Sequence, residues 1–319
     1  MVFVFVLSIF FTIQIISYID VDVKNIKHEQ AGLLYEKKLF SLLLSVQTTR
    51  GMSNAYLNGK TELATKIEEE KSVSNRILQS LNSLESEYGE ILQIRRSLDT
   101  LQSDIENINR IGLNQKSKTT FTAYTNIVES ILTNMNDIAD NTHLTIDENL
   151  VDNYLIRMMV LKIPEIIESL GRSRGLGSGI AAKQTINESQ QTALKLFLQS
   201  ISVNKTSIER AFSVLYRKDS HLEVEFSTVN KDAMDALENF ITATEDELLN
   251  ASSIRIGSTN YFSKGSQTIG AFKALHHKIE QKLSNDMEIH VESMETERLS
   301  ETLLIAVLLS AQCTDVRVN

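Results

Sequence analysis

The chain has 319 residues with only one Pro and 12 Gly, a formal net charge of −9 and a single Cys. The scarcity of Pro and Gly favours long, uninterrupted helices, because both residue types are disfavoured in a helix interior. The negative net charge argues against a broad nucleic-acid surface, so we expect no nucleic-acid partner. The single Cys, Cys313, excludes a disulfide within the chain.

The chain begins with the almost wholly apolar segment MVFVFVLSIFFTIQIISYI, residues 1–19. About 20 such residues span a bilayer as a helix. A signal peptide is the alternative, but it requires a basic start and a small-residue cleavage site, and neither is present. We therefore expect a transmembrane helix at residues 1–19 that continues directly into the helix of residues 20–57.

Residues 20–300 carry the three-and-four spacing of apolar residues that is typical of packed helices. One such series is Ile91, Ile94, Leu98, Leu101, Ile105 and Ile108. Polar and Gly-containing breaks divide the region into eight expected helices, so the predicted class is all-α without a sheet. Pro164 is expected to kink the fifth helix or to begin its ordered part.

An internal repeat relates the two halves of this region at an offset of 124 residues. At this offset Arg50-Gly51 aligns with Arg174-Gly175. The apolar residues Leu42, Leu43 and Val46 align with Ile166, Ile167 and Leu170. The repeat predicts two related four-helix bundles of long helices, at about residues 20–145 and 146–300.

The last helix is expected to run from about residue 259 into a second apolar run, LLIAVLLSA at residues 303–311. A run of this length spans only about 14 Å as a helix, which is too short to cross a bilayer. It is either a C-terminal amphipathic tail or the start of a truncated second transmembrane helix at residues 301–319. We favour the second interpretation, because a long polar helix leads directly into the run.

Two stretches place arginines among small residues: TTRGMSNAYLNG at residues 48–59 and RSRGLGSGIAAK at residues 172–183. Each Gly in a helix costs up to about 1 kcal/mol relative to Ala. The glycines therefore indicate a close backbone approach by another helix or by a ligand. A loose loop is the alternative interpretation.

The arginines in these stretches, Arg50, Arg172 and Arg174, lie on or beside apolar helix faces. A buried Arg requires an anion or a carboxylate to offset its desolvation. Its planar, bidentate guanidinium suits planar oxyanions. Arg255, in the turn at residues 252–258, is a fourth candidate, with a plain inter-helix turn as the alternative.

The chain resembles the NIT domain, the nitrate- and nitrite-sensing domain of bacterial receptors such as methyl-accepting chemotaxis proteins. The resemblance rests on QTTRGMSNAYL (47–57), IESLGRSRGLGSG (167–179) and YFSKGSQTIGAFKALHHKIEQKL (261–283). One departure is Thr49, where many relatives carry a second charged residue. This departure concerns the identity of the ligand more than the fold.

The resemblance implies the sensor region of a bacterial inner-membrane receptor, located in the periplasm or extracytoplasmic space and connected to an output module outside this sequence. The implied ligand is nitrate or nitrite. The implied binding residues are Arg50 and Arg174 and, less directly, Arg172 and Arg255. We also expect a homodimer, a membrane association, and no cofactor, metal site or catalytic residue.

The alternative function is a membrane-tethered helical bundle that acts as a structural or protein-interaction module. In that case Arg50 and Arg174 would pair with internal carboxylates, whereas unpaired guanidinium groups beside a small polar cavity would favour the sensor. An enzyme is disfavoured, because the sequence shows no nucleophile–base pair, metal cluster or phosphate-binding loop.

Overall fold

The computed structural model describes residues 2–144 and 149–318, with side chains described for residues 7, 9–144 and 149–307. Every regular element in this part of the chain is helical, which confirms the all-α class. The helices are α1 (Val2–Leu57), α2 (Ala64–Leu92), α3 (Arg95–Ile111), α4 (Ser117–Asn141), α5 (Leu150–Arg157), α6 (Ile163–Lys183), α7 (Glu188–Lys218), α8 (Ser220–Thr244) and α9 (Ser258–Val318).

Helix α5 joins α6 through one π-helical turn, Met158–Lys162, so the two form a single interrupted helix. Pro164 is buried and lies in the first turn of α6, directly after the π-helical turn. Proline lacks the N–H that the preceding turn would require, and a local change of helix type accommodates this loss. Pro164 therefore marks the irregular point of the fifth long helix, as expected.

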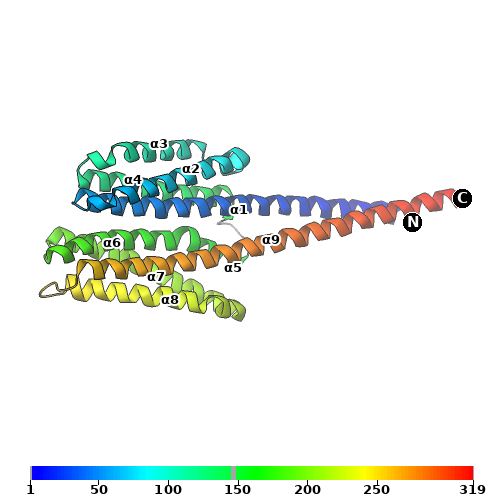
Figure 1. The fold of residues 1–319 in the computed structure, drawn as a ribbon. Coiled ribbons are helices and arrows are strands. Elements are labelled where there is room, and N and C mark those ends of the chain that lie inside the picture. Colours follow the sequence, from blue (N-terminus) through cyan, green and yellow to red (C-terminus); the bar gives the residue numbers. More distant parts are fainter. Residues whose placement is uncertain (1, 145–148, 319) are drawn as a thin grey trace.

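The helices pack in two groups (Figure 1). In the first group α1 packs against α2 and α4, and α3 packs against α4; in the second group α6 packs against α7 and α9, and α8 packs against α9. The apolar series predicted from the sequence faces inward: Leu98, Leu101, Ile105 and Ile108 of α3 are all buried. Contacts of α1 with α6 and α9 join the two groups.

Helices α1 and α9 extend beyond both groups and lie side by side in opposite directions (Figure 1). Ion pairs hold them in one register: Asp20 with Arg298, Lys27 with Glu295, and Lys37 with Glu280. The Phe40 ring of α1 stacks on His276 of α9, with ring centroids 3.5 Å apart. The predicted continuity of the first and last helices, through residues 20–57 and into 303–311, is confirmed.

Within the described residues, no helical segment has both the length and the hydropathy needed to cross a membrane. The transmembrane helix expected at residues 1–19 is therefore not confirmed. The same holds for the start of a second one at residues 301–319. The side chains of residues 1–6, 8 and 308–319 lie outside the described part of the chain.

Gly177 of α6 permits a close approach to α9. A Cβ atom at this position would lie 2.2 Å from Cε1 of Tyr261, whereas a Cβ at Gly175 or Gly179 would meet nothing within 4 Å. The Tyr261 ring is fully buried, and its hydroxyl lies 2.8 Å from Thr244 Oγ1. The interpretation of the glycines as a site of close helix approach thus holds for Gly177 but not for its two neighbours.

We predict that Gly177→Ala destabilises the fold by about 1–3 kcal/mol, because the added methyl group collides with a rigid, buried ring. The matched control is Gly175→Ala, two residues away in the same helix. There the open surroundings should make Ala neutral or stabilising by up to about 1 kcal/mol. Denaturant unfolding of both variants measures the difference, and equal stabilities would contradict the prediction.

Glu36 of α1 is a buried carboxyl group. It is 1% exposed, and neither of its oxygens has a hydrogen-bond partner among the described residues. Burial raises the pKa of Glu36 well above its ordinary value, because desolvation disfavours the charged form. A carboxyl group with a raised pKa in the folded state costs stability as pH rises above its unfolded pKa.

We predict that Glu36→Met raises the free energy of unfolding at pH 8 by about 1–3 kcal/mol, because it removes a buried polar group that has no hydrogen-bond partner in the part of the chain that the structure describes. The gain should shrink towards pH 4.5, where the carboxyl group is protonated in the folded state and increasingly so in the unfolded state. Unfolding at both pH values measures this. Glu69→Met, at an exposed position of α2, is the control and should show no such pH-dependent gain.

Candidate functional site

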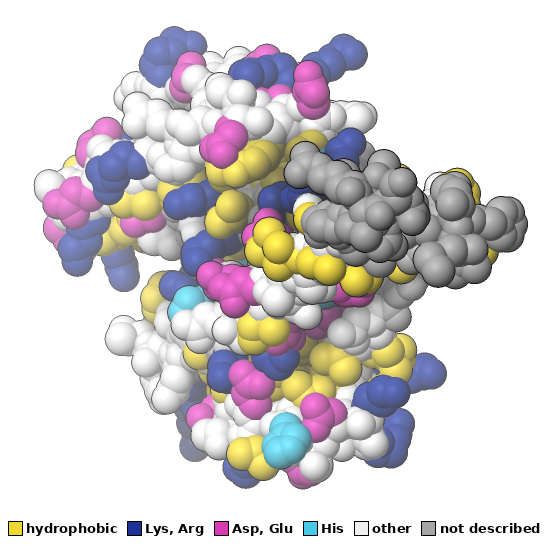
Figure 2. All heavy atoms as spheres, turned by 90° about the vertical axis from the view of Figure 1, so that its right-hand side faces the viewer, with side chains coloured by type: hydrophobic (Ala, Val, Ile, Leu, Met, Phe, Trp, Pro, Cys, Tyr) yellow, Lys and Arg dark blue, Asp and Glu magenta, His cyan; other side chains and the backbone are white. Residues whose placement is uncertain are grey.

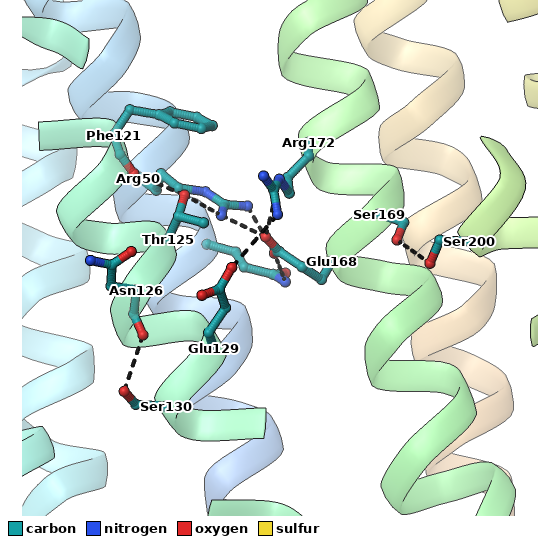
Figure 3. Close-up of polar contacts among 11 residues, drawn as sticks. Arg50, Phe121, Thr125, Asn126, Glu129, Ser130, Glu168, Ser169, Arg172 and Ser200 are labelled. Carbon is teal, nitrogen blue, oxygen red and sulfur yellow. Dashed lines mark hydrogen bonds and ion pairs between the residues drawn. The ribbon is translucent and has the colours of Figure 1, made fainter. Parts of the chain in front are cut away.

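Arg50 lies on the buried face of α1. Leu43, Val46 and Arg50 follow the three-and-four spacing and are all at most 2% exposed, so the helix directs the guanidinium inward. Arg50 donates from Nη1 to Glu168 Oε1 at 2.8 Å and from Nη2 to Glu168 Oε2 at 2.9 Å. The result is a bidentate, buried ion pair between α1 and α6 (Figure 3).

Side chains from α4 complete the surroundings of Arg50. Its Nη1 also donates to Thr125 Oγ1 at 3.1 Å, and its guanidinium carbon lies 5.1 Å from the centre of the Phe121 ring. Both contacts are visible in Figure 3. The guanidinium therefore rests against an aromatic face while its polar edge is directed at α6.

Arg172 lies one helical turn after Glu168 in α6. Its Nη1 is 3.8 Å from Glu129 Oε1 of α4, and its Nε is 4.0 Å from Glu168 Oε1. Its guanidinium also lies over the Phe197 ring of α7, 4.9 Å from the ring centre. These long ion-pair distances leave its buried Nε without a hydrogen-bond partner among the described residues.

Arg174 points towards α9. Its Nη1 donates to Ser266 Oγ at 2.8 Å, and its guanidinium lies 4.5 Å from the centre of the Phe262 ring. Its aliphatic stem fills the space beside Gly265, where a Cβ would lie 2.8 Å from Arg174 Cγ. No ion pair within the described residues links Arg174 to a carboxylate, and its buried Nε has no hydrogen-bond partner there.

The pKa of Arg174 shows the cost of this environment. Burial, with a smaller contribution from the positive charge of Arg50, lowers the pKa of Arg174 to about 10. The side chain therefore stays protonated at neutral pH as a poorly solvated cation.

Arg255 lies apart from these three residues. It is exposed in the loop before α9 and donates from Nε to Ser253 Oγ at 3.2 Å. Its neighbours Ile254 and Ile256 are buried, so Arg255 between them is directed to solvent. Within the described residues, no contact joins Arg255 to the other arginines. Ion pairs to Glu168 bring Arg50 and Arg172 together, and Arg174 lies two residues further along α6, directed at α9.

Glu168 is the residue that our reasoning from the sequence missed. It is 6% exposed, and besides the Arg50 bonds it accepts a hydrogen bond from Gln47 Nε2 at 2.8 Å. A sequence signal for it exists, because Glu168 interrupts the apolar run from Ile163 to Leu170 and precedes Arg172 by four residues. A charged residue within an apolar helix face indicates a buried partner.

The arginine cluster, defined as Arg50, Arg172 and Arg174 with Glu168 and Glu129, carries an unbalanced charge. Three guanidinium groups and two carboxylates leave one positive charge in excess. Such a cluster can hold one monovalent anion. A groove of about 840 Å³ between α3 and α4 is lined by Glu129 but by none of these three arginines, so it is a separate feature.

A search among curated proteins finds no match to this chain. Among solved structures, the fold is similar to that of the NasR transcription antiterminator, with a TM-score of 0.59 and 13% sequence identity. The match covers 91% of this chain and 77% of that chain, and at this identity it shows the fold alone. The family described as nitrate and nitrite sensing matches residues 41–288, which contain the whole arginine cluster. The chain therefore belongs to the nitrate- and nitrite-sensing (NIT) family.

Proposed function

We propose that this protein binds nitrate or nitrite at the arginine cluster, with Arg174 and Arg50 as the principal binding residues and Arg172 beside them. The family membership indicates nitrate and nitrite sensing. The assignment of the ligand to these arginines is our own. It combines the family with the charge of the cluster and the chemistry of guanidinium groups.

The observation that carries the proposal is the state of Arg174. This guanidinium is partly desolvated and has a neutral hydroxyl and an aromatic ring, but no carboxylate, among its described partners. Desolvation without a counter-charge is unfavourable, and a bound anion would offset it. Nitrate is planar and monovalent, which matches both the guanidinium fork and the single excess charge.

The position of the cluster suggests how binding is transmitted. Arg50 is on α1, and Arg174 contacts Phe262, Gly265 and Ser266 of α9. An anion held by both arginines would draw α6 and its partner α9 towards α1. Because α1 and α9 are the two helices that extend from the body, this movement would change their relative position at the projecting end.

The receptor context is likewise a proposal. The apolar sequence of residues 1–19 supports a membrane-associated, extracytoplasmic sensor in a bacterial inner membrane, and we propose that it acts as a homodimer. We propose no nucleic-acid partner for this chain, since its net charge is −9. On the face shown in Figure 2, acidic and basic side chains are intermixed rather than gathered into one basic patch.

A structural or protein-interaction module is the second candidate, and one observation favours it. Arg50 has the internal carboxylate partner that such a module requires, in a buried bidentate pair between the two helix groups. Arg174 lacks that partner within the described residues. The two arginines therefore point to different functions, and ligand binding decides between them.

We predict that the purified full-length chain binds nitrate in calorimetric titration and that Arg174→Ala weakens this binding by about tenfold to a hundredfold. This range corresponds to the loss of one charge-assisted interaction of roughly 1.5–3 kcal/mol. Arg174→Lys should also bind more weakly, because the fork geometry is lost. Chloride is the control anion and should not bind. If the wild-type chain binds neither nitrate nor nitrite, the sensor proposal fails and the structural module is favoured.

Gly265→Ala provides an independent test, because it leaves every arginine in place. The added methyl group would collide with the Arg174 stem, with Cβ only 2.8 Å from Cγ, and displace its guanidinium. We expect nitrate affinity to fall several-fold. Gly270→Ala is the matched control in the same helix, where a Cβ would meet nothing within 4 Å. Equal affinities of the two variants would contradict the placement of the ligand beside Arg174.

A further inference from the structure

Glu168 is the carboxylate of the cluster with the most polar contacts. It receives two hydrogen bonds from Arg50 and one from Gln47, both on α1, and Arg172 Nε approaches it to 4.0 Å (Figure 3). Its side chain is only 8% exposed, so solvent screens its charge weakly. Glu168 therefore determines the electrostatic potential at the arginines more strongly than Glu129, whose side chain is 61% exposed.

A carboxylate is itself a planar, monovalent oxyanion. Glu168 consequently satisfies both terminal nitrogens of Arg50 in the same geometry that an external oxyanion would use. Nη2 of Arg50 also lies close to the backbone of α6, because Gly171 has no side chain and a Cβ there would lie 3.6 Å from it. An anion bound beside Arg50 would therefore be repelled by the buried carboxylate of Glu168.

The charge of the ligand decides how strongly this repulsion acts. The interaction of an anion with fixed charges grows in proportion to its own charge, whereas its desolvation cost grows with the square of its charge. A site with one excess positive charge therefore offsets the desolvation of a monovalent anion better than that of a divalent one. Removing a buried negative charge from the site would increase its attraction energy for a divalent anion by twice the increase for a monovalent anion.

We infer that Glu168 is the selectivity-determining residue of the anion site: its buried carboxylate restricts the site to monovalent oxyanions and excludes divalent ones such as sulfate. This inference rests on the proposed function, since it concerns the same site. It assigns to Glu168 a role distinct from binding, because the residue carries the same sign of charge as the ligand.

The test is calorimetric titration of the full-length chain with sodium nitrate and sodium sulfate at constant ionic strength, for the wild type and Glu168→Gln. Glutamine keeps the size and one hydrogen-bond acceptor for Arg50 while removing the charge. We expect affinity for nitrate to rise by about tenfold and affinity for sulfate by about a hundredfold, the square of the nitrate gain. The ratio of sulfate to nitrate affinity should thus rise about tenfold.

Glu165→Gln is the matched control, since Glu165 is an exposed residue of the same helix. It should change both affinities less than about twofold, because solvent screens an exposed charge. Circular dichroism establishes whether Glu168→Gln keeps its helical fold. If it does not, Glu168→Gln and the wild type are both titrated in trimethylamine N-oxide, an osmolyte that favours the folded state.

The outcomes separate the two proposals. A wild type that binds nitrate, together with an unchanged sulfate-to-nitrate ratio in the folded charge-removing variant, overturns the role of Glu168 and leaves the sensor proposal intact. A wild type that binds neither anion overturns the sensor proposal. In that case the role of Glu168 fails with it, because a site that binds no monovalent oxyanion is not selective for one.

Discussion

The buried ion pair between Arg50 and Glu168 is the constraint on which the rest of the structure depends. It joins α1 of the first helix group to α6 of the second, where both side chains are almost fully withdrawn from water. A pair in this position adds little net stability relative to a well-packed apolar contact, because the desolvation of both charges offsets their attraction. What it does impose is alignment, since breaking it would leave an uncompensated charge in the interface.

The fold was largely predictable from the sequence, and for one physical reason: helical periodicity is a local property. The absence of Pro from all but one position, and the spacing of apolar residues in segments such as 91–108, determine where helices form without reference to distant residues. The candidate site was predictable only in part. Arg50 and Arg174 were found through the repeat and their small neighbours. The local signal for Glu168, a charge within an apolar helix face, indicated a buried partner but could not name it, because Arg50 lies 118 residues away in the chain.

Two arginines that align at the 124-residue offset have different surroundings in the structure. Arg50 and Arg174 occupy matching positions in the two halves, yet one faces a carboxylate of α6 and the other faces a serine and a phenylalanine of α9. The difference arises from the neighbouring helices rather than from the repeated segment. Within the described residues, one of these cations is therefore paired with a carboxylate and the other has only neutral partners.

The antiparallel pairing of α1 and α9 has a consequence for how such a unit is reused. The projecting parts of α1 and α9 lie at the same end of the molecule and contact each other there (Figure 1). A unit whose entry and exit coincide can be inserted into a host chain without separating the host's own ends. This geometry allows the helical body to be joined to other domains of different architecture, provided that each of them offers two adjacent attachment points.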